Sequence, residues 1–195
     1  MSSAAGLPLL LLASTSPQRR AILTQLGIPF EAVSPVYHEE PFELAPRELV
    51  ERHSRGKACS VERLPGQLVL GVDTVVVVDC EVLGKPADAA AAEAMLGRLA
   101  GREHVVCSGL TIVADDGVET ASDETLVRFQ PLDRVTIERY VEGGEWRGRA
   151  GGYAIQERGA MLVAGITGDY LNVVGLPVCL LVQMLERRGF HGDSR

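Results

Sequence analysis

The feature that most constrains the fold is the apolar stretch Leu68–Val78. Both of its alternating faces carry apolar side chains, with Asp73 and Thr74 as the exceptions. A strand that is apolar on both faces is typical of the centre of a sheet that is covered on both sides. The stretch therefore predicts a central strand, and its two polar residues need a separate explanation.

Strand and helix signals alternate on either side of this stretch. They predict an α/β fold with a mixed twisted sheet and flanking helices. Residues 1–195 are expected to form a single domain, since no internal repeat, low-complexity tract or long linker interrupts them. The expected strands are residues 9–13, 30–33, 68–78, 104–113, 124–129 and 171–174, with a polar connection over 114–123. The expected helices are residues 17–27, capped by Ser16, then 46–63, 88–100, 133–142 and a last helix over 178–185.

Composition disfavours several classes of function. The chain carries 19 basic and 26 acidic residues, a net charge of −7, which disfavours a broad nucleic-acid interface. No segment approaches the roughly 20 apolar residues of a membrane span. The apolar run at residues 7–13 has no Lys or Arg before it, so we interpret it as a strand rather than a signal peptide. The four cysteines form no C-x-x-C pair and are expected to be reduced, packed thiols in a cytoplasmic protein.

Lysine is scarce in this chain. Of the 19 basic residues only Lys57 and Lys85 are lysines, and the others are arginines. A compact ammonium is a point charge that suits phosphate oxygens, whereas arginine offers a planar fork. Both lysines therefore become candidate phosphate-binding residues, the alternative being that they are remnants of a biased composition.

Asp73 is the second anomaly, because an ionised carboxylate in an apolar strand is costly unless it is paired, hydrogen-bonded or metal-bound. It is a candidate metal ligand or general base. Glu39 and Glu40, which follow the second expected strand, could supply a partner carboxylate. The alternatives are a satisfied core aspartate and two solvated loop glutamates.

Two further segments suit a phosphorylated ligand. Ser14, Ser16 and Arg19 lie where the first strand meets the first helix, a position where backbone N–H groups and the helix dipole attract anions. The segment 148–156 is rich in glycine, which permits close approach of a ligand, and its Tyr153 and Gln156 could contact a base. The alternatives are an ordinary capped surface helix and a flexible glycine loop.

Taken together, these segments resemble the Maf family of nucleoside triphosphate pyrophosphatases, over residues 10–185. The resemblance implies hydrolysis of a nucleoside triphosphate to the monophosphate and pyrophosphate with a divalent cation, Mg²⁺ or Mn²⁺. It also implies an elongated, Maf/ITPase-like α/β fold with a cleft between two lobes, and a possible homodimer. The motifs that carry it are LASTSPQR at 12–19, GVDTV at 71–75, GKP at 84–86, AGGYAIQ at 150–156 and NVVGLP at 172–177.

By position, the resemblance implies roles for seven residues of this chain. They are Asp73 as catalytic carboxylate, Asp73 and Glu39 as metal ligands, Ser14, Arg19, Lys57 and Lys85 as phosphate-binding groups, and Gln156 near the base.

One departure bears on the base that is recognised. Gln18 stands where the family commonly has an arginine, as in the branch that acts on 7-methyl-GTP, whereas residues 150–156 resemble the branch that prefers dTTP and UTP. We expect dTTP and UTP, because the amide of Gln156 can read a pyrimidine edge. The alternatives are a 7-methyl-GTP pyrophosphatase, a nucleotide-binding regulator of cell division without turnover, and a phosphatase or kinase acting at the terminal phosphate.

Overall fold

The computed structural model describes residues 9–40 and 43–189. It contains a seven-stranded mixed sheet in the order β2-β1-β3-β5-β6-β7, with β4 paired to β3. Strands β1, β2 and β3 are parallel, and the pairs from β3 through β7 are antiparallel. The strands are β1 (Leu10–Ala13), β2 (Phe30–Val33), β3 (Leu68–Val78), β4 (Glu81–Leu83), β5 (Glu103–Ala114), β6 (Gly117–Phe129) and β7 (Val163–Thr167).

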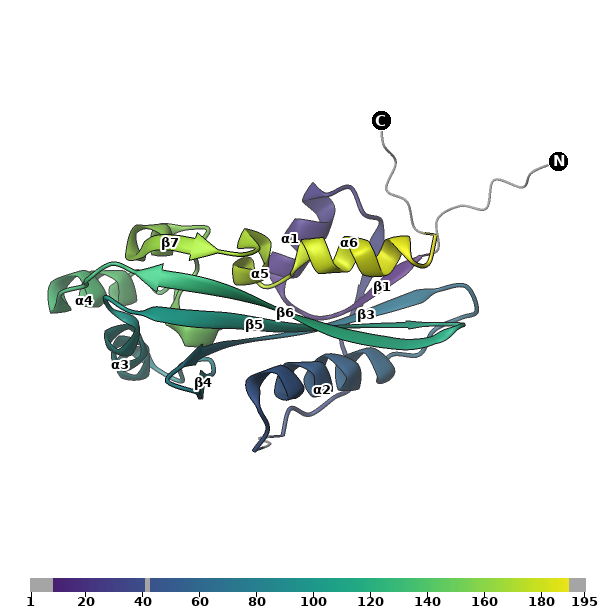
Figure 1. The fold of residues 1–195 in the computed structure, drawn as a ribbon, viewed down its shortest axis with the longest axis horizontal. Coiled ribbons are helices and arrows are strands. Elements are labelled where there is room, and N and C mark those ends of the chain that lie inside the picture. Colours follow the sequence, from purple (N-terminus) through teal and green to yellow (C-terminus); the bar gives the residue numbers. More distant parts are fainter. Residues whose placement is uncertain (1–8, 41–42, 190–195) are drawn as a thin grey trace.

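Helices cover both faces of the long strands (Figure 1). Helix α2 lies on one face, and α1 and α6 lie on the other, so the predicted mixed α/β fold is confirmed. The helices are α1 (Pro17–Gln25), α2 (Pro46–Cys59), α3 (Ala89–Leu99), α4 (Arg134–Glu142), α5 (Tyr170–Val174) and α6 (Val178–Glu186), with short 3₁₀ turns η1 (Ala150–Gly152) and η2 (Arg158–Leu162).

Helix α2 packs unusually closely on β3 and β5, because two glycines of the sheet face it. A Cβ on Gly71 would lie 2.2 Å from the carbonyl oxygen of Ser54, and one on Gly109 would lie 2.3 Å from that of Val50. Neither position accepts a side chain without moving the helix backbone. This close approach brings the α2 side chains against the middle of the central strand.

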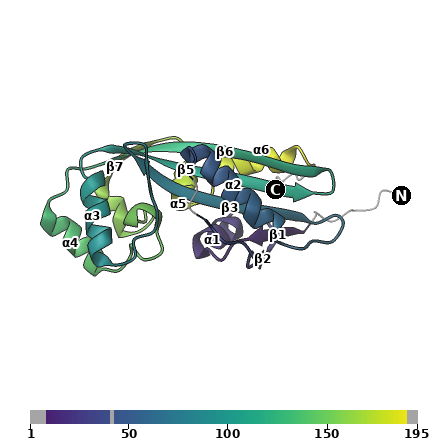
Figure 2. The same cartoon turned by 90° about the horizontal axis from the view of Figure 1, so that it is seen from below.

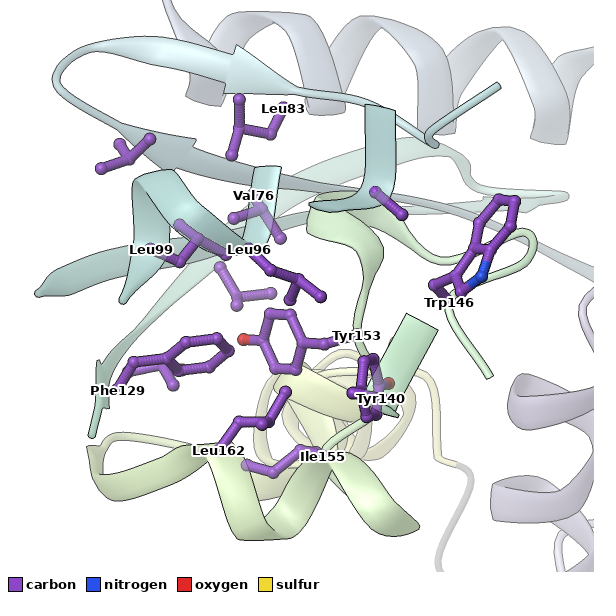
Figure 3. Close-up of a cluster of buried hydrophobic side chains, with 14 of the residues drawn as sticks. Val76, Leu83, Leu96, Leu99, Phe129, Tyr140, Trp146, Tyr153, Ile155 and Leu162 are labelled. Carbon is purple, nitrogen blue, oxygen red and sulfur yellow. The ribbon is translucent and has the colours of Figure 1, made fainter. Parts of the chain in front are cut away.

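Two apolar cores lie at opposite ends of the elongated molecule (Figure 2). One joins β1, β3 and β5 to α1 and α6, and includes Leu70 and Leu181. The other gathers α3, α4 and the segment that follows α4, around Phe129, Tyr140 and Tyr153 (Figure 3). The long strands β3, β5 and β6 run between the two ends and connect them.

Three expected elements are wrong. Residues 171–174 are not a strand: they lie in α5, which Asp169 caps through a 2.8 Å hydrogen bond from the Leu171 N–H. The connection expected over residues 114–123 is instead a continuation of the β5–β6 ladder, with only Asp115 and Asp116 between the strands. The helix expected to reach residue 63 ends at Cys59, and β7 was not expected at all.

Smaller expectations also changed. Ser16 stands at the N-cap of α1, but its side chain makes no capping hydrogen bond. Among the cysteines only Cys107 is buried, and Cys59, Cys80 and Cys179 are exposed, so the expectation of packed thiols was correct for one of them. Within the described residues, no helix combines the length and the hydropathy that a membrane span needs.

Candidate functional site

A polar cleft of about 340 Å³ opens between the two ends of the molecule. One wall is formed by the turn from β1 into α1, by part of the loop before α2, and by α2 itself. The opposite wall is formed by the segment around Lys85 and by the glycine-rich loop 148–156. The cleft thus brings together six of the seven predicted site residues, which are Ser14, Arg19, Glu39, Lys57, Lys85 and Gln156.

Arg19 is fixed at the first wall by three neutral acceptors. Its guanidinium donates from Nε to the carbonyl of Gly175 at 2.9 Å, from Nη1 to Oγ of Ser14 at 3.0 Å and from Nη2 to Oγ1 of Thr74 at 3.2 Å. Burial lowers the pKa of Arg19, while the charges of Asp73 and Glu39 raise it. No carboxylate of the described residues contacts this guanidinium, so its positive charge is available to an anion in the cleft.

Lys57 joins the two candidate carboxylates. Its Nζ lies 2.6 Å from Oδ1 of Asp73 and 2.6 Å from Oε1 of Glu39. Lys57 and Asp73 are 8% and 7% exposed, whereas half of the Glu39 side chain reaches solvent. Two carboxylates and one ammonium give this triad a net charge of about −1 when all three are ionised.

The pKa of Glu39 is lowered by its neighbours. Burial alone would raise it, but the hydrogen bond from Lys57 and the charges of Lys57 and Lys85 outweigh that contribution. Glu39 is therefore ionised at neutral pH and can act as a ligand for a cation.

Asp73 stands one layer deeper than the other members. Lys57 and Glu39 line the cleft, and Asp73 is not among the described residues that do so. It is carried by β3 opposite Gly109 of β5, just beyond the point where β1 ends beside Gly71. Its carboxylate reaches the cleft through Lys57, so the catalytic role assigned to it stays a prediction.

The carboxylates of Asp73 and Glu39 fit a divalent cation that arrives with its substrate. The described residues contain no group of three or more His, Cys, Asp or Glu side chains placed to hold a metal. Mg²⁺ is commonly held by one or two carboxylates, with substrate phosphates and waters completing its shell. Asp73 and Glu39 match this pattern, because their carboxylate oxygens already converge on one positive group, the ammonium of Lys57, and could bind a metal cation in the same way.

The opposite wall is anchored by a buried aromatic cluster. Tyr153, which is 6% exposed, shares a 2.7 Å hydrogen bond with Nε2 of His104, and its ring packs edge-on against Phe129. Figure 3 shows Tyr153 pointing into this core. Burial raises the pKa of Tyr153 and lowers that of His104 to about 4, so both are neutral at pH 7. The expectation that Tyr153 stacks on a base is not supported, because the ring holds the loop that presents Gln156.

Gln156 and Lys85 are exposed at this wall. The backbone N–H of Gly151, which has φ 68°, donates to the carbonyl of Gly84 at 3.0 Å and ties the loop to the Lys85 segment. A Cβ on Gly151 would lie 2.9 Å from Val76, so this position needs glycine for both space and backbone conformation.

No role was assigned from the sequence to three residues that line the cleft, Arg149, Tyr37 and Thr74. The Nε of Arg149 is buried and has no hydrogen-bond partner within the described residues. An arginine among many, and a tyrosine in an irregular segment, carry no local pattern that marks them. The available signals were the glycine-rich motif around Arg149 and the polar Thr74 next to Asp73 in an apolar strand.

An α/β fold whose cleft combines cations on both walls with the Glu39 carboxylate, and with Asp73 directly behind Lys57, is typical of proteins that bind a phosphorylated small molecule. The chain belongs to the Maf family: the family model described as "Maf-like protein" matches residues 9–188. The resemblance drawn from the sequence motifs is thereby confirmed.

Similar proteins span nearly the full chain. The dTTP/UTP pyrophosphatase of Symbiobacterium thermophilum is 54% identical, covering 93% of this chain and 94% of that protein. Proteins of the same name from Gloeobacter violaceus and Pelotomaculum thermopropionicum are 45% and 43% identical, each over 93% of this chain and over 98% and 97% of their own. Among solved structures, the Staphylococcus aureus Ham1 protein aligns at 12% identity with a TM-score of 0.41, covering 62% of this chain and 71% of that one.

Proposed function

We propose that this protein hydrolyses nucleoside triphosphates, dTTP and UTP in particular, to the monophosphate and pyrophosphate. The observation that carries the proposal is the triad at the cleft wall, where one buried lysine joins Glu39, which lines the cleft, to Asp73 behind it, at 2.6 Å each. A site that only binds phosphates needs cations alone, whereas paired carboxylates suit the activation of water beside a metal. The names of relatives at 43–54% identity support the same reaction.

The cations of the cleft are placed for a triphosphate. Arg19 on one wall, and Lys85 and Arg149 on the other, have no carboxylate in contact among the described residues, and each lines the cleft. Their role is to bind the phosphate chain and to stabilise the charge that develops on the departing pyrophosphate. Lys57 is shared with two carboxylates, so in this proposal it reaches a phosphate only after its bonds to them are exchanged.

In the proposed reaction a water oxygen attacks the α-phosphorus, and the bond from that phosphorus to the oxygen bridging to the β-phosphate breaks. Asp73 is the group proposed to accept the water proton on a carboxylate oxygen, once Lys57, which separates it from the cleft, has exchanged its bond to that carboxylate. Asp73 and Glu39 are the carboxylates that would hold Mg²⁺ or Mn²⁺, which would supply neutralisation of the phosphate charge. Arg19 receives the growing negative charge with its donors already oriented by Ser14 and Thr74.

The base preference rests on two glutamines at the cleft. Gln156 is exposed, and its amide edge suits a pyrimidine. Gln18 keeps 7-methyl-GTP as the second candidate, because it departs from the family's common arginine as the branch acting on that nucleotide does. It lines the cleft too, with its Oε1 accepting from Oγ of Ser16 at 3.1 Å. A homodimer, which the resemblance implies, and a cytoplasmic location, which was expected from the cysteines, are further parts of the proposal.

The deciding experiment is a chromatographic assay with Mg²⁺ across dTTP, UTP, CTP, GTP, ATP and 7-methyl-GTP. We expect monophosphate and pyrophosphate, with dTTP and UTP turned over fastest. Asp73→Asn should lower kcat by orders of magnitude while urea unfolding still shows a cooperative fold. Release of orthophosphate would indicate attack at the terminal phosphate, and tight binding without turnover would favour the regulator. A near-wild-type rate for Asp73→Asn would remove that residue from catalysis.

A further inference from the structure

Glu39 is carried by an exposed segment with little backbone support. Of residues 35–40, only Pro35 and Tyr37 are partly buried, and Val36 is 85% exposed. Between described residues, no backbone hydrogen bond ties residues 35–40 to the rest of the fold. The position of the Glu39 carboxylate must therefore be fixed by side chains.

Tyr37 supplies such an anchor. Its hydroxyl shares a 3.0 Å hydrogen bond with Nδ1 of His53, a residue of α2 that is 5% exposed. The two rings meet edge to face with centroids 5.8 Å apart. The tyrosine ring also lies over Gly56, where an added Cβ would stand 2.1 Å from its Cε2. Gly56 thus leaves a notch in α2 that the ring of Tyr37 fills.

The spacing of these contacts matches the geometry of a helix. His53 and Lys57 are four residues apart on α2 and so lie on the same face, one turn from each other. Tyr37 and Glu39 are two residues apart in the loop and contact His53 and Lys57 respectively. One face of α2 therefore binds the loop at two adjacent points, and the second point is the candidate metal ligand.

We propose that Tyr37 is a positioning residue for Glu39. By filling the Gly56 notch and bonding to His53, it places the Glu39 carboxylate at Lys57 and Asp73, where a divalent cation would be held. Its effect on turnover rests on the proposed function, but its effect on the order of the loop does not. Tyr37 also lines the cleft, so a direct contact with the nucleotide is the competing explanation that the tests must separate.

The first test measures loop order and requires no activity. Backbone ¹⁵N relaxation at residues 36–40 should give order parameters near those of rigid backbone, about 0.85, in the wild type, and values falling toward 0.6 or below in Tyr37→Ala. Tyr37→Phe keeps the ring in the notch, so its order parameters should lie between those of the wild type and those of Tyr37→Ala. Val36→Ala, in the same loop, is the matched control and should leave the order parameters of residues 36–40 unchanged. Unaltered order in Tyr37→Ala overturns the proposal.

The second test separates positioning from contact with the nucleotide. Tyr37→Ala should raise the Mg²⁺ concentration for half-maximal rate by about tenfold, the usual effect of losing a group that orients a metal ligand. In a Glu39→Gln background the same substitution should add little, since the carboxylate that it positions is gone. An equal rise in the KM for nucleotide in both backgrounds would instead show direct contact and refute positioning. If the wild type hydrolyses no triphosphate, the proposed function fails and the relaxation data alone decide the role of Tyr37.

Discussion

Removal of the ammonium that joins the two carboxylates is the most direct test of the acidic part of the cleft. Lys57 and Asp73 are both buried, and their side chains meet at 2.6 Å. Lys57→Met keeps a side chain of similar length between α2 and β3 but leaves Asp73 buried without its cation. Loss of one partner from a buried ion pair costs about 3–5 kcal/mol, because the remaining charge has neither partner nor water. Glu39 adds little to this loss, since its half-exposed carboxylate can be hydrated.

A double-mutant cycle separates the ion pair from lost packing. Asp73→Asn alone leaves Lys57 bonded to Glu39, so we expect a smaller loss of about 1–3 kcal/mol. The double variant Lys57→Met, Asp73→Asn contains neither buried charge and should recover much of the loss seen with Lys57→Met. The coupling energy between the two positions should therefore be about 2 kcal/mol or more.

Urea unfolding followed by circular dichroism, at pH 7 with EDTA present, measures each free energy of unfolding. Arg63→Met is the matched control, because Arg63 pairs at 2.5 Å with Asp115, whose side chain is 58% exposed. That pair should be worth at most about 1 kcal/mol. A similarly small loss for Lys57→Met, or single losses that simply add in the double variant, would refute the reasoning.

Three further predictions concern two helix glycines, the buried His104 and the cleft residue Arg149. Gly97→Ala, where a Cβ meets nothing within 4 Å, should stabilise α3 by up to about 1 kcal/mol. Gly56→Ala should instead destabilise the protein by about 1–3 kcal/mol because the ring of Tyr37 must move, and the urea midpoints of the two variants compare these effects. Burial holds the pKa of His104 at about 4, so between pH 6.5 and 4 this residue gains a proton only in the unfolded state. The free energy of unfolding of the wild type should therefore fall by about 1.4 kcal/mol per pH unit relative to that of His104→Gln, and a parallel decline in the wild type and the variant would contradict this. Arg149→Ala should lower kcat/KM about tenfold or more, with a lower kcat as well as a higher KM because the side chain is proposed both to bind the phosphates and to stabilise the departing pyrophosphate. The urea midpoint should stay unchanged, and steady-state kinetics with dTTP would show the effect.

The central part of the fold was predictable because its signal is local. The run Leu68–Val78 is apolar on both faces, and it is the strand β3 at the centre of the sheet. The pairing of the strands over 104–113 and 124–129 was expected, but the continuation of this hairpin beyond residue 113 was missed. Residues 118–124 are mostly polar and at most partly buried, so their strand structure comes from pairing with β5 rather than from a buried face.

The segment Tyr170–Val174 was misassigned for a different reason. Its β-branched and apolar residues favour a strand, but the buried side chain of Asn172 donates to the carbonyl of Val106 at 3.1 Å and to Oγ1 of Thr125 at 3.0 Å. Gly175, at φ 126°, then ends the helix. These partners are more than 45 residues away in sequence, so no local pattern could reveal them.

The candidate site shows the same division between local and distant information. Asp73 was conspicuous because a carboxylate in an apolar strand needs a partner, but the sequence could not show that the partner is Lys57. The identity of that partner depends on the close approach of α2 to β3 at Gly71. The position of Arg149 at the cleft depends likewise on tertiary folding, which brings the loop 148–156 to segments distant in sequence.

The two lysines, equivalent in the sequence argument, occupy different environments. Lys57 is buried with its Nζ at 2.6 Å from each of two carboxylate oxygens, a place where a compact ammonium fits and a planar guanidinium with five donors would leave several unpaired. Lys85 is exposed, and no carboxylate within the described residues contacts it, although its charge lowers the pKa of Glu39. The scarcity argument therefore applies with most force to Lys57, whose requirement for an ammonium comes from carboxylates and not from phosphate. In the proposed function Lys85 has the simpler role of an exposed charge that faces the triphosphate, which an arginine could share.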